Sequence, residues 1–194
     1  MIAFDMDGVL VDSFECWWQV LRDLQIAQGK EPLTRERFAE TWGQDADADR
    51  RSYFPEWTTT EIMARYDAAF PRYAHLIQAE PEAAATLGAL RRPGKRLAVA
   101  TNSPVDIAAR LLGGASLASY FDCIACADLV AEGKPAPDLL HFIARQLGVT
   151  TAEIAYVGDS DYDAVAARAA GLFFVGYRRP GDVRVERLGE LVRE

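Results

Sequence analysis

The sequence has little cysteine and histidine, and each shortage excludes a class of protein. Three cysteines in 194 residues are too few for a disulfide framework. Two of them form a CxxC pair, Cys123 and Cys126, but residues three apart on a strand face opposite sides of the sheet. We therefore expect them to pack in the core and not to share a metal ion. The two histidines, His75 and His141, lie on predicted helices away from every motif described below and are assigned no catalytic role.

Long apolar runs are also missing. No stretch of the chain approaches the roughly 20 apolar residues needed to span a bilayer. The first residues pass directly into a short apolar segment and then into acidic residues, without the basic leader and apolar stretch of a secretory signal. The sequence therefore predicts a cytoplasmic protein with no membrane partner.

Positive charge is scarce as well. Lysine and arginine together number 21 against 29 acidic residues, which gives a formal net charge of −8. This balance argues against nonspecific nucleic-acid binding, which needs basic residues to neutralise phosphates. Lys134 is the single lysine in the second half of the chain. The acidity is at first sight equally unsuited to an anionic small molecule, unless a bound cation offsets it.

Two patterns alternate along the chain and predict an α/β protein. After a short apolar segment, residues 14 to 85 have apolar positions at helical spacing, and beyond them strand and helix patterns alternate with short links. Such alternation is typical of a parallel sheet with helices between its strands. We predict a Rossmann-like parallel sheet core, residues 1–13 and 86–194, with a helical cap domain, residues 14–85, inserted after the first strand. Further strands are expected over 96–100, 122–127, 154–157 and 172–176.

Local signals set finer expectations. Thr58 and Glu61 are spaced as a capping box, and Pro71 should kink or split the helix that follows them. Ser103 is predicted as the N-cap of a later helix, with a proline as its first residue. Residues 180–194 are expected to form a short closing helix. All four tryptophans lie in the predicted cap, where we expect a separate aromatic core, although some rings could face a ligand.

Polar residues gather where the predicted strands end, which is where ligands bind in parallel α/β sheets. Asp5 and Asp7 follow the first strand. Two carboxylates there are costly unless their charge is used, and Mg²⁺ prefers such hard oxygen ligands. The alternative is a simple Asp-Gly turn. Thr101 and Asn102 end the second strand just before a helix, where free backbone N–H groups favour an anion.

The third and fourth strand ends carry charge as well. Lys134, in a Gly-Lys-Pro sequence after the third strand, suits a phosphate partner, although most lysines in loops are simply solvated. Asp159 and Asp163 follow the fourth strand. Acidic residues are common in a first helical turn for electrostatic reasons, but Asp159 stands before the helix, where that reason is weaker.

Together these strand ends resemble a known family. Residues 4–13 (Phe-Asp-Met-Asp-Gly-Val-Leu-Val-Asp-Ser), 101–103 (Thr-Asn-Ser), 134–138 (Lys-Pro-Ala-Pro-Asp) and 157–163 (Val-Gly-Asp-Ser, then Asp163) resemble the four motifs of the haloacid dehalogenase-like hydrolase superfamily. Their order, and the helical segment between the first two, are similar to phosphoglycolate phosphatases and β-phosphoglucomutases.

The resemblance implies a role for each residue. Asp5 would be the nucleophile that forms an aspartyl-phosphate, and Asp7 the general acid and base, with its backbone carbonyl on the metal. Thr101, Asn102 and Lys134 would hold the phosphoryl group. The ligands of Mg²⁺ would be Asp5, Asp7, Asp159 and Asp163, with Asp163 as a direct ligand or as support for a water beside the ion.

The predicted cap would set specificity. Gly43 and Gln44 resemble the substrate-specificity loop of the family, and Arg50 and Arg51 are candidates to reach the substrate, although arginines on a helix are more often solvated. The position three residues after Gly43, where the mutases have an arginine, holds Ala46.

These features predict a Mg²⁺-dependent phosphatase acting on a small phosphorylated metabolite, as a monomer or a homodimer. The alternatives are a sugar phosphomutase of the β-phosphoglucomutase type and a non-catalytic phosphate-binding relative.

Overall fold

A six-stranded parallel sheet forms the centre of the molecule in the computed structural model, which describes residues 1–91 and 94–192. The strand order is β5-β4-β1-β6-β7-β8, with β1 in the middle. The strands are β1 (Ile2–Phe4), β4 (Leu97–Thr101), β5 (Cys123–Cys126), β6 (Ala155–Gly158), β7 (Phe173–Tyr177) and β8 (Val183–Val185). The predicted Rossmann-like α/β fold with a helical insertion after the first strand is confirmed.

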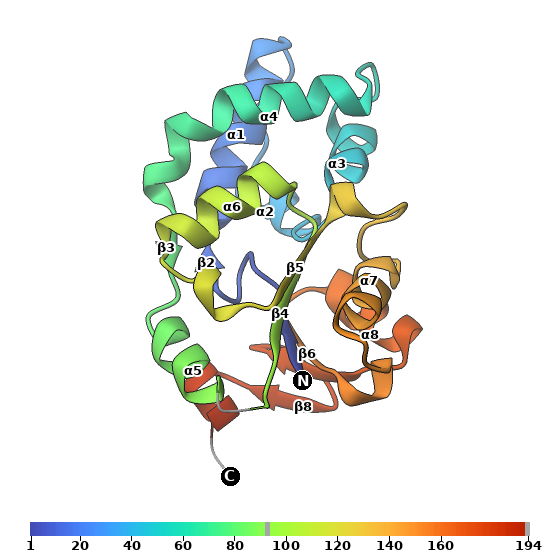
Figure 1. Ribbon diagram of the computed structural model, residues 1–194. Coiled ribbons are helices and arrows are strands. Elements are labelled where there is room, and N and C mark those ends of the chain that lie inside the picture. Colours follow the sequence, from blue (N-terminus) through green and yellow to red (C-terminus); the bar gives the residue numbers. More distant parts are fainter. Residues whose placement is uncertain (92–93, 193–194) are drawn as a thin grey trace.

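Helices cover both faces of the sheet because its strands alternate in side-chain direction. In β4, Leu97 and Val99 belong to one hydrophobic cluster, whereas Ala98 and Ala100 belong to another. The first cluster includes residues of α5 and α6, and the second includes residues of α7 and α8 (Figure 1). These helices are α5 (Ala83–Leu90), α6 (Val105–Gly114), α7 (Asp138–Leu147) and α8 (Asp161–Ala170). Cys123 packs against the second cluster and Cys126 lies in the first, as predicted for opposite faces.

Four further helices lie together at one end of the molecule (Figure 1). They are α1 (Phe14–Ala27), α2 (Arg35–Ala39), α3 (Ala46–Tyr53) and α4 (Thr59–Tyr73), followed by a 3₁₀ turn, η1 (Ala74–Leu76). A small antiparallel sheet of β2 (Val11–Asp12) and β3 (Gln78–Ala79) joins the two ends of this segment. We call residues 13–77 the insert. The division at residues 14–85 stays a prediction.

The aromatic side chains of the insert do not form a separate core. Trp17, Phe38, Trp57 and Phe70 belong to the same hydrophobic cluster as Phe4 of the central strand. The expectation of an independent aromatic core is therefore wrong. The buried apolar side chains directly after β1 belong to this cluster too, so one hydrophobic core is shared by the sheet and the insert. They are Met6, Val9, Leu10 and Val11.

Two local predictions at the start of α6 are wrong, and the predicted split at Pro71 does not occur. Pro71 lies inside α4, which continues to Tyr73, and a kink there stays a prediction. Helix α6 begins at Val105, and its N-cap is Pro104 in an extended conformation, without a side-chain bond from Ser103. Asp128 accepts the Val105 N–H instead, at 3.1 Å.

The C-terminal segment, predicted as a short helix, contains a strand and a 3₁₀ turn. The strand is β8, and the turn is η5 (Leu188–Val192). The last two residues of the predicted helix, 193–194, lie outside the described residues. The remaining 3₁₀ turns are η2 (Ala118–Tyr120), η3 (Ala127–Leu129) and η4 (Thr151–Glu153). No helix within 1–91 or 94–192 is long and apolar enough to cross a membrane.

Candidate active site

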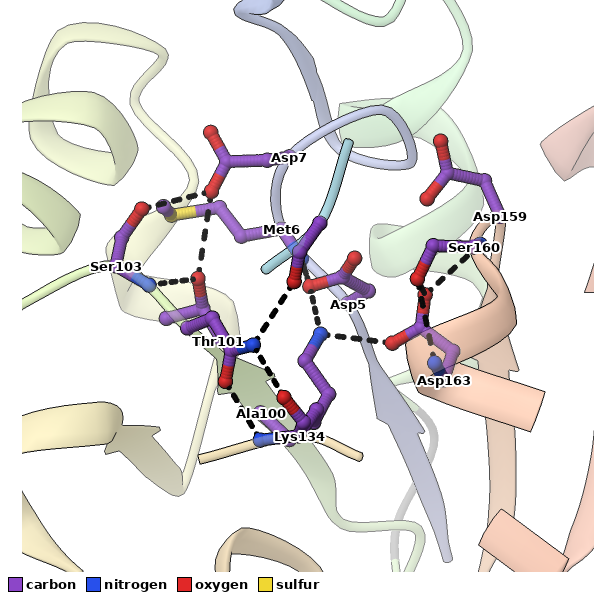
Figure 2. A network of polar contacts seen from close by, with 12 residues as sticks. Asp5, Met6, Asp7, Ala100, Thr101, Ser103, Lys134, Asp159, Ser160 and Asp163 are labelled. Atoms are coloured by element: carbon purple, nitrogen blue, oxygen red, sulfur yellow. Dashed lines mark hydrogen bonds and ion pairs between the residues drawn. The ribbon is translucent and has the colours of Figure 1, made fainter. Parts of the chain in front are cut away.

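The predicted residues meet at the carboxyl edge of the sheet. Asp5 directly follows β1, Thr101 ends β4, and Asp159 directly follows β6. These three strands are neighbours in the sheet, so their ends lie side by side. Lys134 reaches the same point from the loop between β5 and α7 (Figure 2). Ligands bind at this edge in open parallel sheets.

Lys134 is buried between two carboxylates. Its Nζ lies 2.7 Å from Asp5 Oδ1 and 2.7 Å from Asp163 Oδ1, and it donates to the hydroxyl of Tyr156 at 3.1 Å. The three charged side chains are 4% exposed or less. Figure 2 shows the ammonium group placed between Asp5 and Asp163. All three hydrogens of the ammonium group therefore have partners.

Asp163 is held by several donors at once. Besides Lys134, the Tyr156 hydroxyl donates to Oδ1 at 2.7 Å, and the Ser160 N–H and Oγ donate to Oδ2 at 3.0 and 2.5 Å. Ser160 is also the N-cap of α8, so the start of this helix fixes the carboxylate. Burial opposes ionisation, but Lys134 and these hydrogen bonds hold the pKa of Asp163 below its ordinary value.

The pKa values of Asp5 and Asp159 are shifted in the opposite direction. Burial, together with the charge of Asp163, raises the pKa of Asp5 well above its ordinary value, although Lys134 opposes the change. Burial and Asp163 likewise raise the pKa of Asp159 to about 7. Both pKa values are raised because the site holds more negative charge, shielded from water, than the single ammonium group of Lys134 balances.

A divalent cation bound beside these carboxylates would balance the excess negative charge. One carboxylate oxygen from each of Asp5, Asp159 and Asp163 lies within 4.8 Å of the others. Asp159 Oδ1 is shielded from solvent and has no hydrogen-bond partner. Buried carboxylates without partners are expected to be neutralised or to bind metal, and Mg²⁺ prefers oxygen ligands. The donor set therefore suits the predicted ion.

Gly8 makes room for Asp159. Its φ is +86°, and a Cβ at this position would lie 2.0 Å from Asp159 Oδ2. Any side chain here would both strain the backbone and displace the carboxylate. The Asp-Gly pair of the first motif is thus a turn and also part of the site.

Asp7 faces a different set of partners. Its Oδ2 accepts from Ser103 Oγ at 2.9 Å and from Thr101 Oγ1 at 3.3 Å, and its Oδ1 accepts from Ser13 Oγ. Figure 2 shows Asp7 turned toward Thr101 and Ser103, and away from Lys134. The two aspartates of the first motif therefore have separate environments, one ionic and one made of hydroxyl groups.

Asn102 binds backbone atoms. Its Nδ2 donates to the carbonyl oxygens of Gly43 and Lys134 at 2.8 and 2.9 Å, and its Oδ1 accepts the Lys134 N–H at 2.7 Å. The side chain thus positions the loop that carries Lys134 and joins it to the insert.

The insert covers the site through the loop between α2 and α3. Trp42 Nε1 donates to Asp159 Oδ2 at 3.2 Å, and Gly43 contacts Asn102 as described. A cavity of about 60 Å³ lies between the two parts. On its floor are Asp5, Asp7, Thr101 and Lys134. Both cap residues predicted to set specificity, Gly43 and Gln44, line the opposite wall.

Comparison with known proteins identifies the family of this chain. A family profile described as haloacid dehalogenase-like hydrolase matches residues 2–177. The chain belongs to this family. Phosphoglycolate phosphatase of Yersinia pseudotuberculosis is 32% identical over 184 residues, which cover 90% of this chain and 79% of the relative. The prediction of a phosphatase of the haloacid dehalogenase-like type is confirmed.

Solved structures of similar proteins share the fold over almost the whole chain. A hydrolase from Pseudomonas syringae has a TM-score of 0.86 at 27% identity and covers 98% of this chain and 95% of its own. CbbY from Rhodobacter sphaeroides, determined in complex with phosphate, has a TM-score of 0.83 at 26% identity, with the same coverage of both chains.

Within this haloacid dehalogenase-like hydrolase, two features escaped the sequence analysis. Ser103 was interpreted as a helix cap but donates to Asp7, and no local signal in the sequence marks that contact. Asp49 of α3 lines the cavity, although nothing in its helical sequence marks it. Arg50 and Arg51, the predicted candidates, instead pair with Asp47 and are absent from the cavity wall.

Proposed function

We propose that the enzyme hydrolyses a small phosphate monoester in the presence of Mg²⁺, through an aspartyl-phosphate on Asp5. One observation carries the proposal. Three neighbouring carboxylates, two of them buried, and one buried ammonium at the floor of a small cavity leave negative charge that only a cation would balance. Once that charge is balanced, the floor suits a phosphoryl dianion.

Asp5 is the nucleophile in this proposal. Its Oδ1 is fixed by Lys134 and by the N–H of Met6 at 2.7 Å. A carboxylate oxygen of Asp5 forms a bond to phosphorus while the bond from phosphorus to the ester oxygen breaks. Protonated Asp7 gives its proton to the departing alcohol. A water molecule then attacks the phosphorus and loses a proton to Asp7, which releases phosphate and restores Asp5.

The other residues stabilise charge and hold the groups in place. Lys134 favours the ionised form of Asp5 and places positive charge near the transferring phosphoryl group, and the hydroxyl of Thr101 orients Asp7 and lies beside that group. Asp5 and Asp159, with the Asp7 carbonyl, would hold Mg²⁺, which supplies positive charge to the phosphoryl oxygens. Because both oxygens of Asp163 have protein partners, we assign it to holding Lys134 and supporting the metal ligands.

The cavity favours hydrolysis over the mutase alternative. A mutase must hold a second phosphate, and Ala46 lines the cavity where the mutases carry arginine. Lys134, whose donors are occupied, is the only cation among the described residues that line it. The intact set of Asp5, Asp7, Lys134 and Asp159 argues against a non-catalytic relative. A cytoplasmic location and a monomeric or dimeric state stay predictions.

Hydrolysis of an aryl phosphate, with and without Mg²⁺, tests the proposal. Chelation should abolish phosphate release and added Mg²⁺ should restore it. Asp5→Asn should remove activity, and Asp159→Asn should weaken the response to Mg²⁺. The matched control is Asp161→Asn, whose side chain is two residues further along and 91% exposed, and it should retain both. Full activity of Asp5→Asn would refute the covalent mechanism.

A further inference from the structure

The wall of the cavity that the insert provides is apolar and acidic. It has no lysine or arginine among the residues that the structure describes. The side chains of this wall include Trp17, Phe38, Trp42, Gln44, Asp49 and Tyr66. A negatively charged group on the alcohol part of a substrate would meet aromatic rings and one carboxylate there.

The cations on the floor and on α3 are engaged with other partners. The three donors of Lys134 on the floor are occupied, as described above. Arg50 and Arg51 follow Asp49 in sequence, but both guanidinium groups pair with Asp47, and Arg50 also donates to the carbonyl of Trp57 at 3.3 Å. Helix geometry thus points the arginines of α3 away from the cavity that Asp49 lines.

Two hydrogen bonds hold the carboxylate of Asp49 in place as an acceptor. Gln44 Nε2 donates to its Oδ1 at 2.6 Å and the Tyr66 hydroxyl donates to its Oδ2 at 2.5 Å. The Tyr162 hydroxyl donates in turn to Gln44 Oε1 at 3.4 Å, which sets the direction of that amide. The Asp49 side chain is buried, and each carboxylate oxygen can accept a second hydrogen bond. A donor entering the cavity would find this capacity open.

The cavity is small. Its volume of about 60 Å³ suits a phosphoryl group with a short alcohol part better than a large one. That alcohol part would lie between the floor and the wall of the insert, where Asp49 and the aromatic rings line the cavity.

We propose that this enzyme selects short phosphate monoesters whose alcohol part carries no second negative charge and offers an O–H or N–H donor to Asp49. The inference rests on the proposed phosphatase function and narrows its substrate class. Phosphoglycolate, the substrate named for the Yersinia relative, carries a carboxylate at that end. It is therefore a poor substrate for this chain, because like charges repel in a buried site.

Three esters of nearly equal size test the proposal. Phosphoglycolate, 2-hydroxyethyl phosphate and O-phosphoethanolamine end in a carboxylate, a hydroxyl and an ammonium group. We would measure kcat/KM for each with Mg²⁺ at pH 8, and also the inhibition of aryl phosphate hydrolysis by each. The hydroxyl and ammonium esters should exceed phosphoglycolate about tenfold or more in kcat/KM, or in affinity as inhibitors. Equal or better use of phosphoglycolate would overturn the inference alone. Absence of phosphate release from every ester, the aryl phosphate included, would overturn the phosphatase proposal as well.

A variant isolates the role of the carboxylate. Asp49→Asn keeps its size and removes its charge, so the ratio of kcat/KM for phosphoglycolate to that for 2-hydroxyethyl phosphate should rise about tenfold. Because a ratio does not depend on the folded fraction, partial misfolding does not obscure it. Asp67→Asn, next to Tyr66 but on the exposed side of α4, should leave the ratio unchanged. The same ratio in Asp49→Asn and the wild type would refute the assignment to Asp49.

Discussion

Replacing Asp49 by asparagine should change how the stability of the protein depends on pH. Burial raises the pKa of Asp49 from its ordinary 3.8 to about 7, against the opposing hydrogen bonds from Tyr66 and Gln44. Between these two pH values the unfolded chain has lost the proton that the folded chain keeps. Stability due to this group is therefore greatest at low pH and decreases as pH rises toward 7.

The size of the effect follows from the shift. A difference of roughly three pKa units corresponds to about 4 kcal/mol of unfolding free energy lost at pH 8 relative to strongly acidic solution. Between pH 5 and pH 8, a practical range, about 3 kcal/mol of that loss occurs. Asparagine has no proton to exchange, so the Asp49→Asn variant lacks this dependence. Its lost or rearranged hydrogen bonds add an offset that does not change with pH.

Urea denaturation from pH 5 to pH 8, in the presence of chelator, measures the difference. The unfolding free energy of Asp49→Asn minus that of the wild type should increase by about 3 kcal/mol across the range. Asp159, with a pKa of about 7, titrates in both proteins and cancels in the subtraction. The exposed variant Asp161→Asn should run parallel to the wild type. A constant difference between Asp49→Asn and the wild type would refute the reasoning.

Three other substitutions address the floor of the site. Lys134→Met leaves two buried carboxylates unpaired and should lower the unfolding free energy by about 3–5 kcal/mol near neutral pH, measured in urea; a loss below about 1 kcal/mol would contradict the buried pair. Gly8→Ala should abolish the rise in Tm on adding Mg²⁺, because its Cβ would collide with Asp159, whereas Gly29→Ala, with no neighbour within 4 Å and a similar positive φ, should keep it. Ser103→Ala should reduce kcat, but by less than the roughly 10²–10⁴-fold expected for losing the general acid Asp7 itself. A change in KM with kcat unchanged would contradict a role for Ser103 in orienting Asp7.

The strand ends could be predicted from sequence because a parallel sheet gathers them automatically. Asp5, Lys134 and Asp159 each follow a short apolar run, and any such sheet brings these positions to one edge. The strand β3 could not be predicted, because two residues are too few to show alternation.

Contacts across the cavity depend on packing that no local pattern encodes. Asn102, predicted to bind phosphate, has two backbone carbonyls and an N–H against its side chain, contacts that no local pattern indicates. Its binding of phosphate stays a prediction. Asp49 resembles any acidic residue in a first helical turn until α4 brings Tyr66 against it. A helix-cap assignment for Ser103 was reasonable locally, and it failed because Asp128 caps the helix from another segment.

The paired strands β2 and β3 make the length of the insert nearly free to change. Both crossings between the sheet and the insert lie side by side, at Val11–Asp12 and Gln78–Ala79. Holding two such points together costs loop-closure entropy that grows only by about 0.6 kcal/mol for each doubling of the intervening chain. Asp5, Lys134 and Asp159 all lie outside that interval. Insertions, deletions or an exchanged segment between the two crossings can therefore alter what the cavity admits while the reacting groups keep their positions.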